Sequence, residues 1–433
     1  MQGVQARQAA HQPRDCRSFQ ETFILSTVLE SESRPHATAP AAVRSTPSSS
    51  APILSDVLLE RLGERAARYD RDNQFFSEDL DDLVRAGFLR AAVPLELGGL
   101  GLTLPELVRE QIRLASRAPS TALALNMHQY WIGAALHLLR LGDTSAQWIL
   151  TEAAAGAVFA AGHGEPGNDL GLAHSFVKAT PLPDGSYRFD GHKIFTSLAP
   201  AWTWLGVHGR DDSDPAHPKI IHAFIHRDSP GHRTVKTWDA LGLRATQSDD
   251  TLLEGAVAPA GRVIRILPAG VPNDPFVDGI LGAVLPGLAA VYYGIAQRAF
   301  SLALSSAQSR SSAVLEGKTH AYKPLTQWSV AEAAIELDSI EALLERVAQQ
   351  WWQGYPEGEL WIARLLAAKQ HAVDGALRVV NLALKIAGAG ALSRQNELER
   401  LYRDVRAGAF HPPNADASHE VIGQAWLGVL GKV

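Results

Sequence analysis

The stretch YRDVRAGAFHPPN, residues 402–414, is the most informative part of this chain. It begins with closely spaced charged residues and ends with His411 in front of two prolines and an asparagine. Pro412-Pro413 restricts the backbone directly after the imidazole, because the pyrrolidine ring fixes φ. After its Arg-Asp pair the stretch contains no carboxylate, and the next acids along the chain are Asp416 and Glu420. Between Asp404 and Asp416 the chain therefore offers one imidazole, His411, and no carboxylate.

The composition is that of a large globular protein. The 433 residues are 46% hydrophobic, enough to bury the cores of two or three domains. The net charge is −6 and no basic stripe is present, so we expect no nucleic acid partner. A single cysteine, Cys16, excludes an intramolecular disulfide and fits a reducing, cytoplasmic location.

The histidines give no sign of a metal site. All 16 are scattered, without the spacing of zinc ligands. His222 and His226 form an H-x-x-x-H pattern, but they lie in an expected strand, where four residues span about 13 Å. That separation is too large for both imidazoles to hold one ion, so the sequence predicts no metal.

Two segments raise the question of a membrane or a targeting signal. The apolar run 279–296 approaches the length of a membrane span. It is interrupted by glycines and by Pro286, and it continues into Gln297-Arg298, so we expect a buried helix that is broken near its start and no membrane anchor. Residues 1–50, rich in Ser, Ala, Pro and Arg, are expected to be a disordered extension or the result of a start codon called too far upstream; a transit peptide is the alternative, against which their acidic residues argue.

The remaining chain falls into three segments of different periodicity. Apolar residues recur on one helix face over Leu58–Tyr69, alternation and turns such as Asp184-Gly185 mark strands, and one apolar helix face repeats over Val330–Val347. Helices, then strands, then helices predict an α+β multidomain protein and not an alternating Rossmann chain. The predicted domains are 51–156 (helical), 157–270 (β) and 271–433 (helical).

Several stretches resemble, in the same order, motifs of the acyl-CoA dehydrogenase family. They are VPLELGGLG (93–101), GEPGND (164–169), DGHKIFTS (190–197), LGLRAT (241–246), GIAQRA (294–299) and LYRDVR (401–406). Matches in the right order are more specific than any one of them alone. The resemblance implies an N-terminal helical domain, a middle β-barrel-like domain and a C-terminal four-helix bundle.

The same resemblance implies a flavin cofactor, FAD or alternatively FMN. An isoalloxazine ring is flat, largely apolar and polar along one edge, so it needs an apolar wall and a few hydrogen-bonding groups. By resemblance, Phe195 lies against the ring and Ser197 hydrogen-bonds near N5. The loop that contains Gly164, Glu165 and Asp169 supplies backbone donors. An ordinary core aromatic is the alternative interpretation of Phe195.

In this family the flavin diphosphate lies at a subunit interface, where it meets a glycine-rich loop of the neighbouring subunit. The matching residues are Lys385, Gly388 and Gly390, and small residues permit a close backbone approach to phosphate. Arg310 stands where the family places an arginine that reaches the same diphosphate; a solvated arginine at a helix end is the alternative. The resemblance therefore implies a homodimer or a homotetramer.

The family's catalytic Glu, which removes the α-proton of an acyl thioester, corresponds to Pro412. A second family position for this base corresponds to Val284, and neither residue can act as a base. The group D flavin monooxygenases, a subgroup similar to dibenzothiophene monooxygenase, carry K-x-F-x-S in the strand and His-x-Pro in the C-terminal loop. The resemblance to this subgroup assigns catalytic roles to His411, Ser197 and His128, as donors to a flavin C4a-peroxide.

We therefore expect a flavin-dependent oxidoreductase that leans toward monooxygenase-type oxidation of a small molecule. Desaturation of an acyl-CoA with a relocated base is the alternative, and a non-catalytic member of the fold is the third interpretation. Structural histidines are the alternative interpretation of His128 and His411. The expected partners are a small-molecule substrate (an acyl-CoA or another organic compound) and, as redox partner, a flavin reductase or an electron-transfer flavoprotein.

Overall fold

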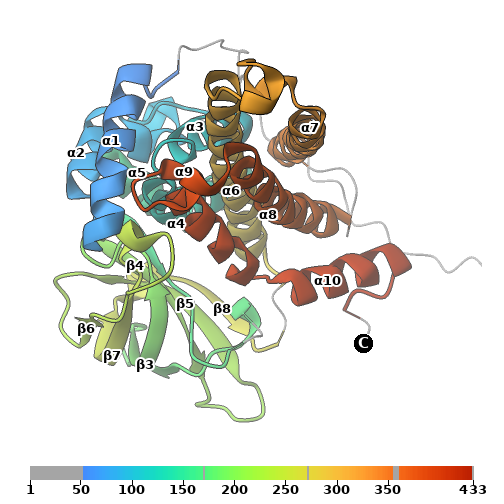
Figure 1. The fold of residues 1–433 in the computed structure, drawn as a ribbon. Coiled ribbons are helices and arrows are strands. Elements are labelled where there is room, and N and C mark those ends of the chain that lie inside the picture. Colours follow the sequence, from blue (N-terminus) through green and yellow to red (C-terminus); the bar gives the residue numbers. More distant parts are fainter. Residues whose placement is uncertain (1–51, 169–170, 271–272, 355–359, 432–433) are drawn as a thin grey trace, which may run out of the picture. The chain divides into compact units, whose positions relative to one another are not determined.

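The computed structural model describes residues 52–168, 171–270, 273–354 and 360–431. The expected extension 1–50 and the candidate residue Asp169 lie outside this part of the chain. Helices occupy 56–154, strands occupy 159–268, and helices follow again over 275–427. The strands form one region, and the helices from both ends of the described chain lie together beside it (Figure 1).

The N-terminal helices start where the sequence supplies caps. They are α1 (Asp56–Asp72), α2 (Ser77–Arg85), α3 (Leu104–Ala115), α4 (Pro119–Arg140) and α5 (Gln147–Ala154). The Ser55 hydroxyl accepts a hydrogen bond from the Leu58 N–H and so satisfies a donor at the start of α1. Thr103 and Glu106 form a reciprocal capping box at the start of α3. The caps fix the starts of α1 and α3, and α3 lines a small cavity of the helical region.

The strands form one sheet, in the order β6-β7-β3-β2-β4-β5-β8, with β1 parallel to β4. Their bounds are β1 (Phe159–Gly162), β2 (Lys178–Pro181), β3 (Tyr187–Thr196), β4 (Trp204–Asp211), β5 (Lys219–His226), β6 (His232–Val235), β7 (Asp249–Ala258) and β8 (Val263–Pro268). β3 and β7 pair antiparallel, with a register shift between Lys193 and Thr196. A shift of this kind re-aims side chains, and it falls where the sequence predicts the flavin wall.

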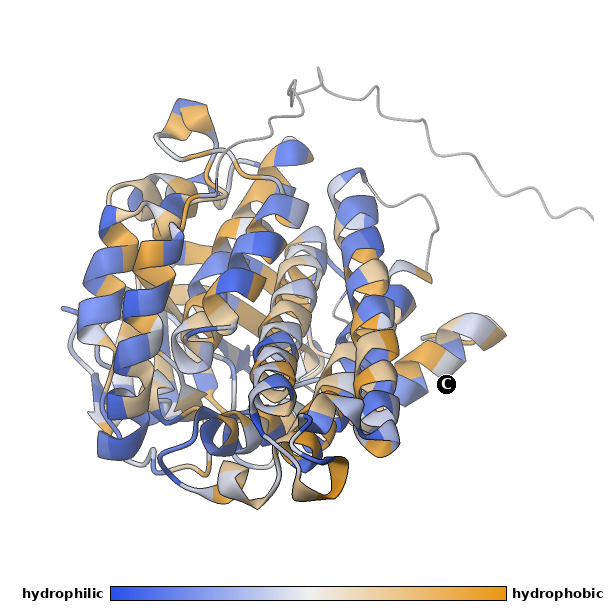
Figure 2. Ribbon diagram, turned by 45° about the horizontal axis from the view of Figure 1, so that its top comes forward, coloured by the Kyte–Doolittle hydropathy of each residue, from blue (hydrophilic) through white to orange (hydrophobic). Residues whose placement is uncertain are grey.

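The C-terminal helices pack around one apolar helix. They are α6 (Pro275–Ser309), α7 (Pro324–Trp352), α8 (Leu360–Ala387), α9 (Glu397–Val405) and α10 (Ala415–Leu427). α6 packs against α3, α4, α7, α8 and α9. By length and composition it is the one helix among the described residues that could cross a membrane, but 83% of its apolar window is buried inside the protein. Colouring by hydropathy shows hydrophobic and hydrophilic residues in stripes along the helices (Figure 2).

The expected break in the apolar run is wrong, because α6 continues through Pro286. The glycines on either side of this proline serve close packing. A Cβ atom on Gly282 would lie 2.0 Å from the Trp351 ring, and one on Gly287 would lie 1.9 Å from the Asn126 side chain. The glycines that suggested an interruption therefore admit α4 and α7 against an unbroken helix.

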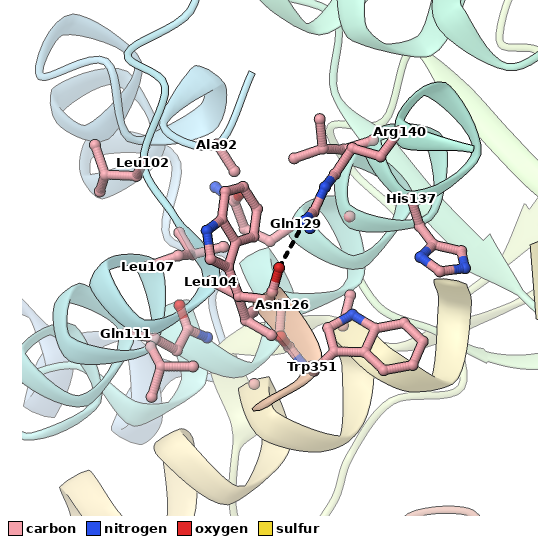
Figure 3. Close-up of a pocket in the computed structure, with 16 residues that line it drawn as sticks. Ala92, Leu102, Leu104, Leu107, Gln111, Asn126, Gln129, His137, Arg140 and Trp351 are labelled. Atoms are coloured by element: carbon pink, nitrogen blue, oxygen red, sulfur yellow. Dashed lines mark hydrogen bonds between the residues drawn. The ribbon is translucent and has the colours of Figure 1, made fainter. Parts of the chain in front are cut away.

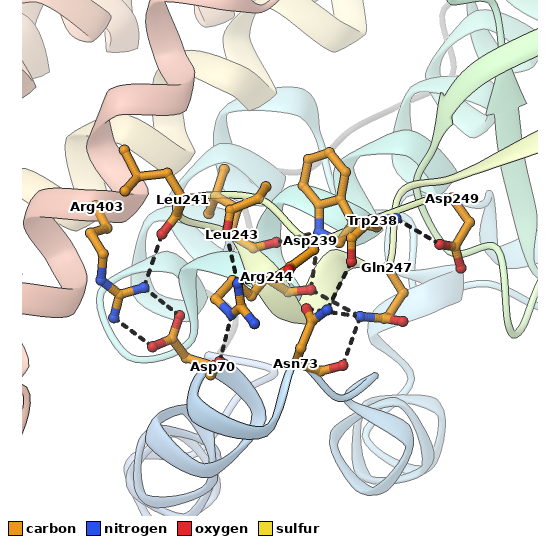
Figure 4. Close-up of polar contacts among 11 residues, drawn as sticks. Asp70, Asn73, Trp238, Asp239, Leu241, Leu243, Arg244, Gln247, Asp249 and Arg403 are labelled. Carbon is orange, nitrogen blue, oxygen red and sulfur yellow. Dashed lines mark hydrogen bonds and ion pairs between the residues drawn. The ribbon is translucent and has the colours of Figure 1, made fainter. Parts of the chain in front are cut away.

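One polar cluster ties the three segments together (Figure 4). Arg403, on α9, donates two hydrogen bonds to the carboxylate of Asp70 on α1, at 2.8 and 2.6 Å, and a third to the Leu241 carbonyl at 3.0 Å. Arg244 donates to the Asp70 carbonyl at 2.8 Å, and Gln247 donates to the Asn73 carbonyl at 3.0 Å. The loop before β7 is thus held between the first helix and the last motif of the sequence.

The neighbouring Asp404 strengthens this junction from the other side. Its Oδ1 accepts a hydrogen bond from the Leu243 N–H at 2.6 Å. Gly242 packs so tightly that a Cβ atom would lie 2.3 Å from the Arg403 carbonyl oxygen. Arg403 therefore binds the Leu241 carbonyl and Asp404 binds the Leu243 N–H, so the pair holds the loop backbone at both ends of residues 241–243.

Replacing Asp70 by alanine should destabilise the whole fold. Arg403 would keep Glu399 as a partner but would lose its bidentate bond, and removing one member of a buried pair costs about 3–5 kcal/mol. The free energy of urea unfolding measures this loss. The control is Asp56→Ala on the same helix, whose carboxylate is 90% exposed and whose removal should cost less than about 1 kcal/mol. Equal losses in both variants would contradict the role given to Asp70.

Candidate active site

Phe195 lies at the end of β3 with a backbone conformation that residues other than glycine rarely adopt. Its φ is +58° and its side chain is 63% exposed. A non-glycine residue in the left-handed region is strained, and such residues gather at functional sites. Its ring meets Trp238 edge-on, with centroids 6.2 Å apart. The result is an exposed aromatic face that a flat ligand can cover.

Ser197, two residues further on, begins a chain of hydroxyl groups. Its Oγ lies 2.8 Å from Ser248 Oγ, which lies 2.8 Å from Thr246 Oγ1, and Thr246 donates to the Leu243 carbonyl at 2.9 Å. Each hydroxyl carries one proton. Because Thr246 donates to Leu243, Ser248 donates to Thr246 and Ser197 donates to Ser248. Ser197 is thereby left as an acceptor toward a ligand, and it offers its own proton only if the bond to Ser248 breaks.

The loop after β1 contains Gly164 and Glu165, and it is tied to β3 from behind. The Gly164 carbonyl accepts from the Ile194 N–H at 2.9 Å, and a Cβ atom on Gly164 would lie 2.6 Å from the Ile194 oxygen. Glu165 is 4% exposed and pairs with the fully buried Lys193. It also accepts from the Phe176 N–H at 2.6 Å. The side chain of Glu165 is therefore used inside the β domain, and this residue can offer only its backbone to a cofactor.

Three imidazoles lie together at β1, β4 and β5, and two of them, those of His208 and His222, are fully buried. His163 and His208 are 5.3 Å apart by ring centroids, and His208 and His222 are 5.9 Å apart and stacked. Both ring nitrogens of His222 and the Nε2 of His163 have no hydrogen-bond partner. Burial lowers the pKa of all three, to about 4 for His222, and the nearby Lys193 ammonium acts in the same direction. The cluster is therefore neutral at pH 7.

His128 connects two backbone segments. It is fully buried on α4; its Nε2 lies 2.7 Å from the Leu89 carbonyl oxygen, and its Nδ1 accepts from the Phe159 N–H at 3.1 Å. These two bonds fix the tautomer with the proton on Nε2 and leave no ring nitrogen for a ligand. The predicted catalytic role of His128 is not supported by this geometry, and its alternative interpretation as a structural histidine fits the contacts.

His411 has a different environment. Its Nε2 is buried without a hydrogen-bond partner, and its ring lies 5.7 Å from that of Tyr292 on α6. Lys369 of α8 donates to the backbone carbonyl of His411 at 3.0 Å. Burial, aided by the charge of Lys369, lowers the pKa of His411 to about 4. His411 thus keeps a free nitrogen that can donate or accept a hydrogen bond.

The predicted diphosphate residues lie together at the ends of two helices. Arg310 follows α6 and donates to the Ala387 carbonyl at the end of α8. Gly388 has φ +77°, and a Cβ atom there would lie 2.9 Å from the Arg310 guanidinium. Gly390 is open, and it lines with Arg310 a groove of about 340 Å³. Lys385 is exposed one turn earlier on α8.

A separate small cavity of about 40 Å³ lies between α3, α4, α6 and α7 (Figure 3). Its wall is mainly apolar, and Trp351 and Trp352 contribute from the end of α7. Arg140 donates to the Trp352 carbonyl at 2.7 Å. Gln111 and Gln129 also line the cavity, and their Oε1 atoms have no hydrogen-bond partner. A space of this size holds water or one small group of a ligand.

The structure brings Ser197 into the loop network that Arg403-Asp404 holds, through Thr246 and Leu243. Sequence reasoning missed the residues that support the candidate site: Tyr292, Lys369, Lys193 and Ser248. Strict alternation would place Lys193 and Phe195, two residues apart, on the same face of β3, and the register shift between Lys193 and Thr196 lets one be buried and the other exposed. Tyr292 and Lys369 gave no signal, because their partners are far away in the sequence.

The C-terminal part of the chain, residues 286–414, matches the family model of the acyl-CoA dehydrogenase C-terminal domain. YdbM of Bacillus subtilis (strain 168), itself provisionally assigned as an acyl-CoA dehydrogenase, is 29% identical over 381 residues, covering 85% of this chain and 94% of YdbM. A dibenzothiophene monooxygenase of Rhodococcus erythropolis is 26% identical over 379 residues, covering 82% of this chain and 88% of its own.

A solved structure agrees with these relatives. KijD3 in complex with FMN and dTDP-3-amino-2,3,6-trideoxy-4-keto-3-methyl-D-glucose is 27% identical, with a TM-score of 0.74 over 86% of this chain and 92% of KijD3. Fold and relatives thus define an oxidoreductase with a β domain between two helical segments. The chain is similar to members of the acyl-CoA dehydrogenase family over most of its length, including monooxygenases with that fold, and its C-terminal part matches that family's model. The predicted resemblance and the predicted fold class are confirmed.

The buried imidazoles should make stability depend on pH. The pKa of His222 is lowered on folding, so the unfolded chain binds the proton first, and stability falls as the pH drops below about 6.5. His222 alone should cost about 2 kcal/mol between pH 8 and pH 5. In His222→Leu the loss measured by urea unfolding should shrink by that amount. Phe224→Leu on the same strand should instead lower stability equally at both pH values, and an unchanged pH dependence in His222→Leu would contradict the assignment.

Proposed function

We propose that this protein is a flavin-dependent oxidoreductase that oxidises a small organic molecule in the manner of a monooxygenase. The observation that carries the proposal is the C-terminal loop, which presents His411 with an unpartnered nitrogen and contains no carboxylate. Asp416 and Glu420, the acids nearest in sequence, are both exposed on α10. The loop therefore offers a hydrogen-bonding group to a reacting atom and lacks a base suited to α-proton abstraction.

The residues at the end of β3 fit a flavin. Phe195 offers an exposed, strained aromatic face, and Ser197 offers one hydroxyl beside it, as a flat ring with one polar edge requires. The backbone of the loop at Gly164 is held close to this strand. A bound flavin supplies two-electron redox chemistry and, when reduced, reactivity toward O₂. The proton arrangement of the hydroxyl chain leaves Ser197 as an acceptor, which suits an N–H group at the flavin edge.

The groove at Arg310 and Gly390 supports FAD as the cofactor, because a guanidinium and an open glycine backbone suit a diphosphate. FMN is the alternative, and it is the flavin bound to KijD3. If the groove receives the diphosphate of a neighbouring subunit, the protein acts as a homodimer or a homotetramer. A flavin reductase or an electron-transfer flavoprotein would then deliver or remove the electrons.

Acyl-CoA desaturation is the second candidate, favoured by the likeness to YdbM. The two functions differ in what reduces the flavin. Anaerobic mixing of the oxidised holoprotein with a panel of acyl-CoA thioesters should leave the flavin absorbance unchanged, whereas reducing the flavin first and then admitting O₂ should return it to the oxidised form. Rapid loss of the flavin absorbance on mixing with any acyl-CoA would support acyl-CoA desaturation in place of the proposed function. A purified protein that binds neither FAD nor FMN would remove both candidates.

Ser197→Ala should impair reactivity more than stability. One lost hydrogen bond costs about 0.5–1.5 kcal/mol in folding, while a donor or acceptor at a reacting group is worth about 10²–10³ in rate. We expect flavin reoxidation coupled to product formation to fall by about that factor, with the flavin still bound. Ser309→Ala, an exposed hydroxyl at the end of α6, serves as control. Unchanged turnover in Ser197→Ala would make this serine purely structural.

A further inference from the structure

Strained backbone gathers at the end of β3, in the loop before β7 and at the end of α1. Six of the described residues other than glycine have a positive φ, and five of them lie in these three stretches: Asn73, Phe195, Leu198, Leu243 and Gln247. Gln247 donates to the Asn73 carbonyl at 3.0 Å, and the Leu198 N–H donates to the carbonyl of residue 246 at 3.2 Å. Such conformations persist only where the surrounding structure imposes them, and they gather at functional sites. The region therefore needs residues that hold it in this form.

Trp238, in the loop before β7, is bound to three parts of this region (Figure 4). Its backbone N–H donates to the Asp249 carboxylate at 3.1 Å, and its carbonyl accepts from the Asn73 side-chain amide at 2.8 Å. Its indole N–H donates to the Arg244 carbonyl at 3.1 Å. The indole N–H is the only polar group of a tryptophan side chain. The position and the orientation of Trp238 are therefore set by β7, by the end of α1 and by its own loop.

The indole of Trp238 is also the aromatic neighbour of Phe195. The ring centroids lie 6.2 Å apart and the ring planes meet at 80°, an edge-to-face arrangement that aromatic pairs favour. Phe195 is 63% exposed, so few other contacts hold its ring. Asp249, which binds the Trp238 backbone, pairs with Thr196 in the register of β3 and β7. Trp238 thus contacts the ring of Phe195 directly and is tied to the next strand position through Asp249.

The anchor of the indole belongs to the junction between the β domain and the helices. The carbonyl of Arg244 binds the indole, while its guanidinium donates to the Asp70 carbonyl at 2.8 Å. The carboxylate of Asp70 in turn binds Arg403 at 2.8 and 2.6 Å. The contacts therefore run without interruption from the Arg403–Asp70 ion pair through Arg244 and Trp238 to the exposed ring of Phe195.

We propose that Trp238 is a positioning residue of the flavin site. It holds the Phe195 ring in the orientation in which the isoalloxazine covers it, and it ties that orientation to the junction at Arg244. This inference rests on the proposed function and deepens it, because it names the residue through which the helical segments influence cofactor binding. Trp238 acts through Phe195, so it need not touch the flavin itself.

Fluorine NMR tests the contact without any flavin. In the full-length protein labelled with 4-fluorophenylalanine, the resonance that is missing from Phe195→Leu belongs to position 195. Trp238→Leu should shift this resonance, because the ring current of the indole is lost, and should narrow it, because the ring gains mobility. Trp328→Leu, which removes a 69% exposed indole on α7, should leave it in place. A Phe195 resonance that stays unmoved in Trp238→Leu would overturn the proposal.

A double-variant cycle on flavin binding tests whether Trp238 acts through Phe195. Flavin fluorescence measures the dissociation constants of FAD and FMN. Trp238→Leu should raise them at least about fivefold, as the loss of one aromatic pair allows, and Phe195→Leu should raise them at least as much. Adding Trp238→Leu to Phe195→Leu should then change binding by less than about twofold. Losses that multiply would show that the two residues act independently, and they would contradict the positioning role.

Trp238→Phe separates the aromatic ring from its anchor. The variant keeps an aromatic neighbour for Phe195 and removes the indole N–H that donates to Arg244. Its flavin dissociation constants and its Phe195 resonance should both lie between those of the parent and those of Trp238→Leu. Values equal to the parent's would overturn the link between the Phe195 ring and the junction.

The outcomes separate this inference from the proposed function. A protein that binds flavin and reacts with O₂, but whose Phe195 resonance and flavin affinity are unmoved by Trp238→Leu, retains the function and loses the positioning role. A protein that binds neither FAD nor FMN loses the function, and the fluorine resonance then still decides whether Trp238 holds Phe195.

Discussion

The ion pair between Arg403 and Asp70 is the constraint on which the candidate site depends. It joins the first helix, the loop before β7 and the last sequence motif, which are far apart in sequence. Next to it, Asp404 holds the Leu243 N–H while the Leu243 carbonyl anchors Thr246. The position of the Ser197 hydroxyl thus depends, through a chain of hydrogen bonds, on the same helix that leads into the His411 loop. A buried pair of this kind adds geometric definition more reliably than stability.

On its buried side the end of β3 packs against polar and charged groups, where an apolar core would ordinarily lie. Lys193 and Glu165 form an ion pair that is closed to solvent, with neutral imidazoles around it. Such a cluster is costly, because several of its nitrogens are unpaired and its charges are desolvated. The arrangement fixes Gly164 and Phe195 relative to each other, since Gly164 directly precedes Glu165 and Phe195 lies two residues after Lys193. The protein thus accepts a loss of stability at the place where the strained Phe195 is held in position.

The sequence predicted those features that depend on local pattern. The 3.6-residue period located the long helix that became α7, and the ordered motifs located Phe195, Ser197 and the Arg403-Asp404 pair. It failed where the decisive partner is distant in sequence. The sequence predicted His128 as a pocket residue, but both of its ring nitrogens form hydrogen bonds, one with Leu89 and one with Phe159. The glycines of α6 suggested a break in the helix, but they pack against Trp351 and Asn126, which are distant in sequence.

Electrostatics around the C-terminal loop connects these observations to chemistry. Lys369 buries a cation against two carbonyls of the loop, and burial lowers its own pKa to about 8. Its charge disfavours a proton on His411, whose pKa of about 4 makes the imidazole a weak base. Removal of a carbon-bound proton needs a stronger base held next to that carbon. A neutral imidazole is suited instead to donate or accept a hydrogen bond, which is the role that the proposed function gives to His411.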